Sequence, residues 1–323
     1  MTGRLFYGDC FGIMQDEFRL SSVDLIYMDP PFNSNRQYNA IYRDETGNPL
    51  PDQIDAFCDM WTLDAEREHA IRTMPIQMQA SGIDSSAAEL WRLWLHALRH
   101  TQPRLLAYLS YMAERLLVMY RILKPTGSLY FHCDPTVSHY VKPLLDAIFG
   151  HGNFRNEIVW KRTSAQNDAK ALGRAHDTIF IYAKDVRRCV WNRQYQAYDP
   201  AYIKSHYRHE DSKGRRFRTD NLTATGLSGG GYEYEWNGVR RVWRSPRSRM
   251  EELESQGRIR YTRNGTAEYI RYLDEMPGVA LQDVWTDVPP INSQAKERMG
   301  YATQKPLALM ERIIAASSNP GGG

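Results

Sequence analysis

The chain has 323 residues, of which 42% are hydrophobic and 24% are charged, and its net charge is +3. This composition suits a soluble globular protein of one large or two medium domains. Four scattered cysteines without a CxxC pair argue against a disulfide framework or a zinc site. No signal peptide and no apolar run long enough to span a bilayer is present, so we expect a cytoplasmic protein without a membrane segment.

Alternating apolar strands and amphipathic helices follow one another along the first part of the chain. The pattern predicts strands at 4–9, 23–29, 127–134, 156–162 and 177–184, and helices at 10–18, 103–123 and 138–150. Near the end of the chain we expect a helix in which Leu307, Met310, Ile313 and Ile314 share one face. This order predicts a parallel, doubly wound α/β sheet, in which ligands bind beyond the carboxyl ends of the strands.

Two segments interrupt this pattern. Residues 41–100 are predicted to be an insertion carrying some helix, in which Trp91 and Leu98 belong to a stripe that packs. Residues 185–275 carry a net charge of +5, whereas residues 1–184 carry −2. Arginine and lysine alternate with tyrosine and tryptophan in that basic segment, as is typical of a region that contacts nucleic acid.

The strand at 23–29 ends in an unusual way, in the sequence YMDPPFN. The prolines stiffen the loop, and the Asp29 carboxylate and the Pro30 carbonyl are two acceptors held beside the flat ring of Phe32. Two acceptors next to a stacking surface fit a planar group with an exocyclic amine, such as a flipped adenine or cytosine. An ordinary turn, with Asp29 capping its own backbone and Phe32 buried, is the alternative for a bare Asp-Pro-Pro.

DPPF resembles the catalytic motif of DNA methyltransferases that methylate amines, whose consensus is Asp/Asn/Ser-Pro-Pro-Tyr/Phe. The resemblance extends along the chain in the motif order of the β group. It is carried by LFYGDC, RILKPTGSLYFHCD, VKPLLDAIFG, NEIVWKR with HDTIFIYAK, and YATQKPLALMERIIAASSNPGGG. The fold that it implies is the Rossmann-like, doubly wound sheet of the S-adenosylmethionine-dependent methyltransferases, with an inserted target-recognition region.

The resemblance implies direct methyl transfer from S-adenosylmethionine to the N6 amine of a flipped adenine in DNA. Residues Asp29, Pro30, Pro31 and Phe32 would be catalytic, and Asn33 would bind the substrate. The cofactor would lie against Asp9 and Cys10 at its adenosine and against Thr303, Gln304, Lys305 and Pro306 near its methionine end. Asp29 in the first motif position favours adenine, because cytosine-amine enzymes more often carry serine there.

The resemblance also predicts how the chain is divided. Residues 1–184 would form the catalytic core, 185–280 the target-recognition region, and 281–323 a cofactor-side helix of the core. The Gly-rich cofactor loop of the family, Asp-Pro-Phe-x-Gly-x-Gly, is not found in this sequence. The sheet is therefore expected to be incomplete at the C-terminus, and we expect the chain to bind the cofactor weakly or not at all by itself.

Three functions remain open at the level of the sequence. The first is an adenine-amine methyltransferase of a restriction–modification or phage system, with double-stranded DNA as substrate and a restriction subunit or a second copy as partner. The second is a methyltransferase for the N4 amine of cytosine. The third is an inactive DNA-binding fragment. A metal site at His132, Cys133, Asp134 and His139 is not expected, because methyl transfer needs no metal ion.

Overall fold

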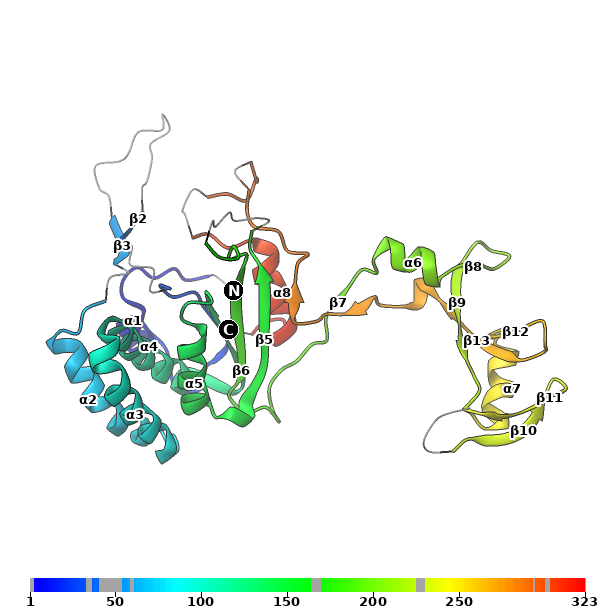
Figure 1. The fold of residues 1–323 in the computed structure, drawn as a ribbon, viewed down its shortest axis with the longest axis horizontal. Coiled ribbons are helices and arrows are strands. Elements are labelled where there is room, and N and C mark those ends of the chain that lie inside the picture. The colour runs from blue at the N-terminus through cyan, green and yellow to red at the C-terminus, as the bar shows by residue number, and fades with distance from the viewer. Residues whose placement is uncertain are drawn as a thin grey trace. The chain divides into compact units, whose positions relative to one another are not determined.

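The chain folds into two compact units, and the second is an insertion in the first (Figure 1). One unit joins residues 1–194 to residues 282–323, and the other consists of residues 195–281. The computed structural model describes residues 3–32, 37–40, 54–58, 61–163, 170–224, 230–292, 294–299 and 303–322.

The first unit is built around a mixed sheet with the strand order β1-β4-β6-β5-β15. Its strands are β1 (Val23–Met28), β4 (Leu123–Cys133), β5 (Phe154–Lys161), β6 (His176–Ala183) and β15 (Val284–Trp285). β1 is parallel to β4 and β15 is parallel to β5, whereas β6 is antiparallel to both of its neighbours. The predicted all-parallel sheet is therefore wrong. The described part of the β5–β6 connection contains no helix of the kind that returns a chain for parallel pairing.

Helices cover both faces of this sheet. One face carries α4 (Pro103–Ile122) and α5 (Ser138–Phe149), and the helices α1 (Cys10–Glu17), α2 (Ala65–Ala80) and α3 (Ser85–Thr101) pack beside them. The other face carries α8 (Leu307–Ser317), where the hydroxyl groups of Ser317 and Tyr130 are hydrogen-bonded at 2.7 Å. The unit also contains the antiparallel strands β2 (Gln37–Ala40) and β3 (Ile54–Cys58) and the short helix η1 (His151–Asn153).

Local sequence explains where the helices of the first unit begin. Proline 103 occupies the first turn of α4, where a missing N–H costs nothing. Asp64 caps α2 and Asp84 caps α3, each by accepting a backbone N–H of the first turn. The indole N–H of Trp91 donates to the carbonyl of Ile71 at 3.0 Å and ties α3 to α2. Within the predicted insertion at 41–100, the described residues 61–100 thus include a pair of helices that packs on α4.

Two expectations about local structure are wrong. The described residues 4–9 form no strand, and Leu5 is 99% exposed, so this segment lacks the pairing that its apolar pattern suggested. In α8 the buried residues are Leu309, Ile313, Ala316 and Ser317, whereas Leu307 and Ile314 are exposed. The helix is therefore rotated relative to the expected apolar face, and Ser317 on its buried face bonds to Tyr130 of β4.

The second unit has its own small core. Buried side chains of Leu222, Trp236, Trp243, Met250, Leu253 and Ala267 make up this core. The hairpin of β10 (Tyr232–Trp236) and β11 (Val239–Trp243) turns through Asn237 and Gly238, both at positive φ, as a two-residue hairpin turn requires.

The other strands of this unit form two further antiparallel sheets, with strand orders β12-β13-β9-β8 and β14-β7. These strands are β7 (Tyr195–Gln196), β8 (His209–Glu210), β9 (Arg216–Asn221), β12 (Ile259–Tyr261), β13 (Ala267–Tyr272) and β14 (Val279–Ala280). The helices described in this unit are α6 (Pro200–His206), α7 (Arg247–Ser255) and η2 (Leu273–Glu275). None of the helices in the described ranges has the length and apolar character that crossing a membrane requires.

Candidate active site

Asp29 follows the last residue of β1, at the edge where the carboxyl ends of β1 and β4 meet. Its side chain is 26% exposed, so the carboxylate faces the surface without being fully solvated. Pro30 is buried and Phe32 is half-buried against the core of the first unit. The loop is therefore anchored to the core directly after Asp29. Asn33, the predicted substrate-binding residue, lies outside the described residues.

Lys305 binds this carboxylate from the other end of the chain. Its Nζ donates to Asp29 Oδ2 at 2.6 Å and to the carbonyl oxygen of Thr303 at 3.2 Å. The same ammonium lies over the ring of Phe32, 5.6 Å from the ring centroid. Only 14% of the Lys305 side chain is exposed. One nitrogen that carries N–H donors thus contacts both the carboxylate and the aromatic ring of the motif.

His132 lies directly beneath Phe32 and is completely buried. The ring centroids of His132 and Phe32 are 5.6 Å apart, and His132 Nδ1 lies 3.9 Å from Asp29 Oδ1. Nδ1 also contacts the Tyr27 hydroxyl at 2.5 Å, while Nε2 contacts Asp177 Oδ2 at 3.1 Å. A carboxylate accepts, so Nε2 carries a hydrogen and donates to Asp177, and both ring nitrogens have a partner. The side chain has a fixed orientation for this reason.

Because β6 is antiparallel to β4 and β5, Asp177 lies beside His132, and together with Asp29, Phe32 and Lys305 these residues form the Asp29 cluster. Asp177 is the second residue of β6, so it stands at the same sheet edge as the last residues of β4 and β5. It is 2% exposed, and its Oδ1 lies 3.0 Å from Arg162 Nε in an ion pair that lacks hydrogen-bond geometry. We missed Asp177 in the sequence, although an aspartate at the start of an otherwise apolar strand is a signal for a paired buried carboxylate.

Asp9 serves the structure of the first unit through a second buried cation. Arg115, 3% exposed, donates from one guanidinium nitrogen to both carboxylate oxygens of Asp9, at 2.7 and 2.6 Å. Asp9 also caps α1 by accepting the N–H of Phe11. Partial burial would raise the pKa of Asp9, but the bonds from Phe11 and Arg115 outweigh this effect and hold the pKa below its ordinary value. An arginine inside the apolar face of the 103–123 helix was the available signal for this pair.

The remaining predicted cofactor residues lie on two separate segments of the first unit. Cys10 is exposed at the start of α1, and Pro306 is buried at the start of α8. Gln304 uses its amide within its own loop, where it accepts from Met299 N and donates to the carbonyl of Glu297. No hydrogen bond or ion pair between described residues joins the Asp9–Cys10 segment to the 303–306 segment.

The described residues contain no cluster of three or more His, Cys, Asp or Glu side chains that could hold a metal ion. The run His132, Cys133 and Asp134 illustrates why. Strand alternation sends His132 to the face of β4 that carries Tyr130, and Cys133 to the opposite face with the core of the first unit. Asp134 accepts from the backbone N–H and the hydroxyl of Thr136 instead.

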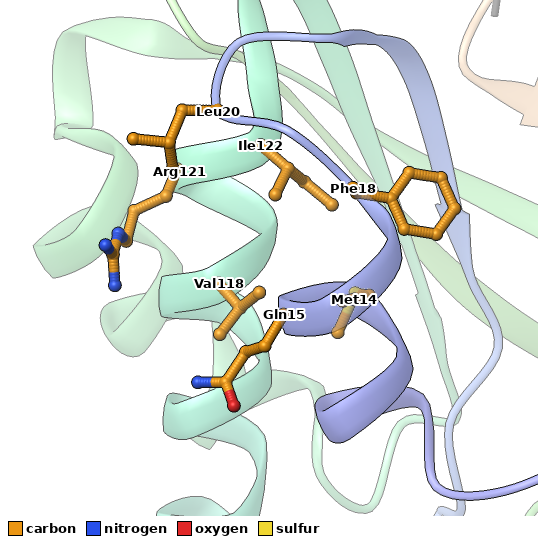
Figure 2. Close-up of a pocket in the computed structure, with 7 residues that line it drawn as sticks. All are labelled: Met14, Gln15, Phe18, Leu20, Val118, Arg121 and Ile122. Carbon is orange, nitrogen blue, oxygen red and sulfur yellow. The ribbon is translucent and has the colours of Figure 1, made fainter.

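A cavity of about 220 Å³ lies elsewhere in the first unit, between α1 and α4 (Figure 2). Its lining consists of Met14, Gln15, Phe18, Leu20, Val118, Arg121 and Ile122. None of the predicted site residues lines this cavity, so it is distinct from the Asp29 cluster.

Sequence comparisons with known proteins point to one family, the DNA methylases. A model of the N6/N4 DNA methylase family matches residues 23–323. The type II methyltransferase M.EcaI of Enterobacter cloacae is 30% identical over 220 residues, which are 67% of this chain and 48% of that protein. The Mod subunit of the type III restriction-modification enzyme StyLTI of Salmonella typhimurium is 26% identical over 318 residues, which are 93% of this chain and 44% of that protein.

The chain thus spans less than half of the length of these two relatives. A solved structure of PvuII DNA methyltransferase, named as cytosine-N4-specific, aligns at 16% identity with a TM-score of 0.26. That alignment covers 56% of this chain and 49% of the other, and its score is too low to support an argument about the fold. The family model, by contrast, matches all but the first 22 residues, and the chain therefore belongs to the DNA methylase family.

Proposed function

We propose that this chain carries the base-binding site of a site-specific DNA methyltransferase that methylates the N6 amine of adenine in a flipped nucleotide. The observation that carries the proposal is the contact of Lys305 Nζ with Asp29 Oδ2 at 2.6 Å, over the ring of Phe32. This position holds a cationic nitrogen with N–H donors beside an aromatic surface. An aromatic amine becomes such a nitrogen when it attacks a methyl group.

The proposed chemistry follows from the change in charge at the amine. The neutral amine donates its two N–H groups to the Asp29 carboxylate and the Pro30 carbonyl, which directs its lone pair outward. When a new N–C bond forms from this lone pair and the bond between the methyl group and its donor breaks, the nitrogen becomes positively charged, and one N–H proton then leaves to water. Asp29 stabilises the positive charge as it develops, and this is the differential stabilisation that accelerates a reaction.

Phe32 and His132 have separate proposed roles in this site. Phe32 offers its ring to the flipped base, and stacking of this kind contributes about 1–3 kcal/mol per base. His132 lies beneath Phe32, and its bonds to Tyr27 and Asp177 fix the height of that stacking surface. His132 is thus a positioning residue, because it acts on the base only through Phe32 and Asp29.

We propose S-adenosylmethionine as the methyl donor, held by Asp9, Cys10, Thr303, Gln304, Lys305 and Pro306. When bound, it supplies an electrophilic methyl group. Asp9 suits this role in part, because 59% of its side chain is exposed beside the bonds to Arg115. Gln304 and the N-terminus of α8 suit it less, since Glu297 already accepts the N–H of Leu307 and the amide of Gln304 is satisfied within its loop. The fit of the described residues is therefore partial, and the base-binding side is the more complete one.

The second unit supports a proposed role in DNA binding. Residues 195–281 contain 15 Lys and Arg against 12 Asp and Glu, and exposed arginines can neutralise phosphates. We propose double-stranded DNA as the substrate, in the cytoplasm, and a restriction subunit or a second copy of the chain as a partner. The partner rests on similarity to a protein named as a Mod subunit.

Methyl transfer to DNA tests the proposal directly. Radiolabelled S-adenosylmethionine and unmethylated bulk DNA are incubated with the wild-type chain, Asp29→Ala and Asp134→Ala. We expect label in N6-methyladenine, a loss of about 10²–10³-fold or more in Asp29→Ala, and no loss in the Asp134→Ala control. Activity that survives in Asp29→Ala would contradict the mechanism. Label in N4-methylcytosine would transfer the mechanism to cytosine, and DNA binding without label would leave a DNA-binding fragment.

A further inference from the structure

We infer that Lys305 occupies the position of the target amine in the free protein and must leave Asp29 when a base enters. The inference rests on the proposed base-binding role of Asp29 and Phe32. It goes further by assigning to Lys305 a competitive contact, whereas the resemblance placed this residue only near the cofactor. Two segments separated by 276 positions in the sequence meet at this contact.

Lys305 Nζ occupies the space beside both groups that are proposed to hold the base. It is 2.6 Å from Asp29 Oδ2 and 5.6 Å from the centroid of the Phe32 ring. The second oxygen, Oδ1, lies 3.9 Å from His132 Nδ1, and the buried His132 ring closes that side of the carboxylate. A base that stacks on Phe32 and donates to Asp29 therefore takes the space of the ammonium.

Lys305 is suited to exchange because its second contact does not depend on Asp29. Nζ also donates to the carbonyl of Thr303, on its own segment. The side chain is a flexible four-carbon stem, so the ammonium can leave the carboxylate without a change in the backbone. Its departure on base entry removes the positive charge from Asp29 before a positive charge develops on the amine. The free protein is thereby spared an unpaired carboxylate, which is costly in a half-buried site.

The exchange distinguishes bases by their hydrogen-bonding groups. Deoxyadenosine carries an exocyclic amine that replaces the N–H donors of Lys305. Thymidine carries a carbonyl oxygen at the corresponding position, which accepts and does not donate. Thymidine can therefore approach Phe32 only if the ammonium stays in place and donates to it. Removal of the ammonium should strengthen binding of the first nucleoside and not of the second.

Nucleoside binding tests this inference without cofactor, recognition sequence or turnover. Dissociation constants for deoxyadenosine, deoxycytidine and thymidine are measured by NMR titration of the full chain. The variants are Lys305→Met, which keeps the apolar stem, Lys305→Arg, which keeps the pair, and Lys296→Met, an exposed control on the neighbouring segment. We expect about tenfold tighter binding of deoxyadenosine to Lys305→Met, since each factor of ten is about 1.4 kcal/mol, the size of one charged hydrogen bond. Lys296→Met should bind it as the wild type does, Lys305→Arg should not bind it more tightly than the wild type, and thymidine binding should not tighten.

Each outcome separates this inference from the proposed function. Equal deoxyadenosine binding by wild type and Lys305→Met would overturn the exchange and leave the base site in place. Tighter binding of thymidine to the same degree would show a general opening of the pocket and would also overturn it. If no nucleoside binds to any folded variant, the base site at Asp29 itself is wrong. In the wild type, the ¹⁵N signal of the Lys305 ammonium should shift with deoxyadenosine and not with thymidine, and an unchanged signal in the deoxyadenosine complex would contradict the exchange.

Discussion

At the scale of single residues, Asp29 lies between two side chains of different kinds, the flexible Lys305 and the rigidly held His132. Lys305 neutralises Asp29 through a flexible chain, whereas His132 is held at both ring nitrogens and buried completely. Asp177 and Arg162 extend the fixed part of the network. The proposed exchange therefore involves only the Lys305 side chain, while the His132 ring beside Phe32 stays in place.

Replacing His132 by phenylalanine should destabilise the first unit. The ring contacts with Phe32 and Trp160 are retained, but Asp177 and the Tyr27 hydroxyl each lose the hydrogen-bond partner that His132 provides. We expect a loss of about 1–3 kcal/mol in the free energy of unfolding, measured by urea titration. His139→Phe, at an exposed position of α5, is the control. An unfolding midpoint in His132→Phe equal to that of the wild type would show that the network contributes nothing to stability.

The Asp9–Arg115 pair predicts a dependence of stability on acid. The pKa of Asp9 is lower in the folded chain than its ordinary value of 3.8, so its contribution is present above that pH and is lost as the pH falls through the folded value. In Asp9→Asn we expect lower stability at neutral pH and a shallower loss below pH 3.8. Asp16→Asn, exposed on the same helix, should keep the wild-type profile. Unfolding is followed by tryptophan fluorescence, and identical acid profiles for Asp9→Asn and wild type would refute the stabilising role.

Residue patterns predicted one side of the site and missed the other. The loop at Asp29 could be read from the strand that precedes it, because a strand and its end are local. The contacts to Lys305, His132 and Asp177 are not local, and no pattern within one segment specifies them. The motif TQKP pointed to Lys305 through resemblance alone.

At the scale of elements, the direction of β6 decides which side chains meet. Because β6 is antiparallel to β4 and β5, its first residues lie beside their last residues. The sequence predicted both strands, since their apolar runs are continuous, but assumed that each strand follows a helix. The absence of a helical pattern between 162 and 177 was the signal for an antiparallel pair. In α8 the pattern gave the helix but not its rotation, which depends on how it packs on Tyr130.

The contact between α8 and the sheet predicts a loss of stability in alkali. Burial raises the pKa of Tyr130 to about 12, although the hydrogen bond with Ser317 opposes the shift. Because the pKa of Tyr130 is raised, the contribution of this side chain to the free energy of unfolding is complete below pH 10. This contribution falls as the pH rises from 10 towards 12, by about 2–3 kcal/mol in total. In Tyr130→Phe this alkaline loss should be smaller, and about 0.5–1.5 kcal/mol should be lost at neutral pH with the hydrogen bond.

Chemical denaturation at several pH values measures both effects. Tyr7→Phe, at a position that is 80% exposed in the same unit, is the matched control and should follow the wild type throughout. A steep alkaline loss that persists in Tyr130→Phe would assign it to another group.

At the scale of the whole molecule, each unit has a core of its own and should unfold in its own transition. Trp91, 1% exposed, belongs to the core of the first unit, and Trp243, 0% exposed, to that of the second. Each Trp→Ala change should cost about 3–5 kcal/mol in its own unit. In calorimetry we expect Trp243→Ala to lower one transition and Trp91→Ala to lower the other. A single transition that both variants lower equally would mean that the units unfold together.

The pairing of Asp29 with Lys305 also has a consequence in time. The 276 positions between these residues take roughly 14–55 s to synthesise at about 5–20 residues per second. The whole second unit is synthesised during this interval, before Lys305 exists. The Asp29 carboxylate of a nascent chain is therefore without this counter-ion for tens of seconds, and the contact can form only after Lys305 has been synthesised.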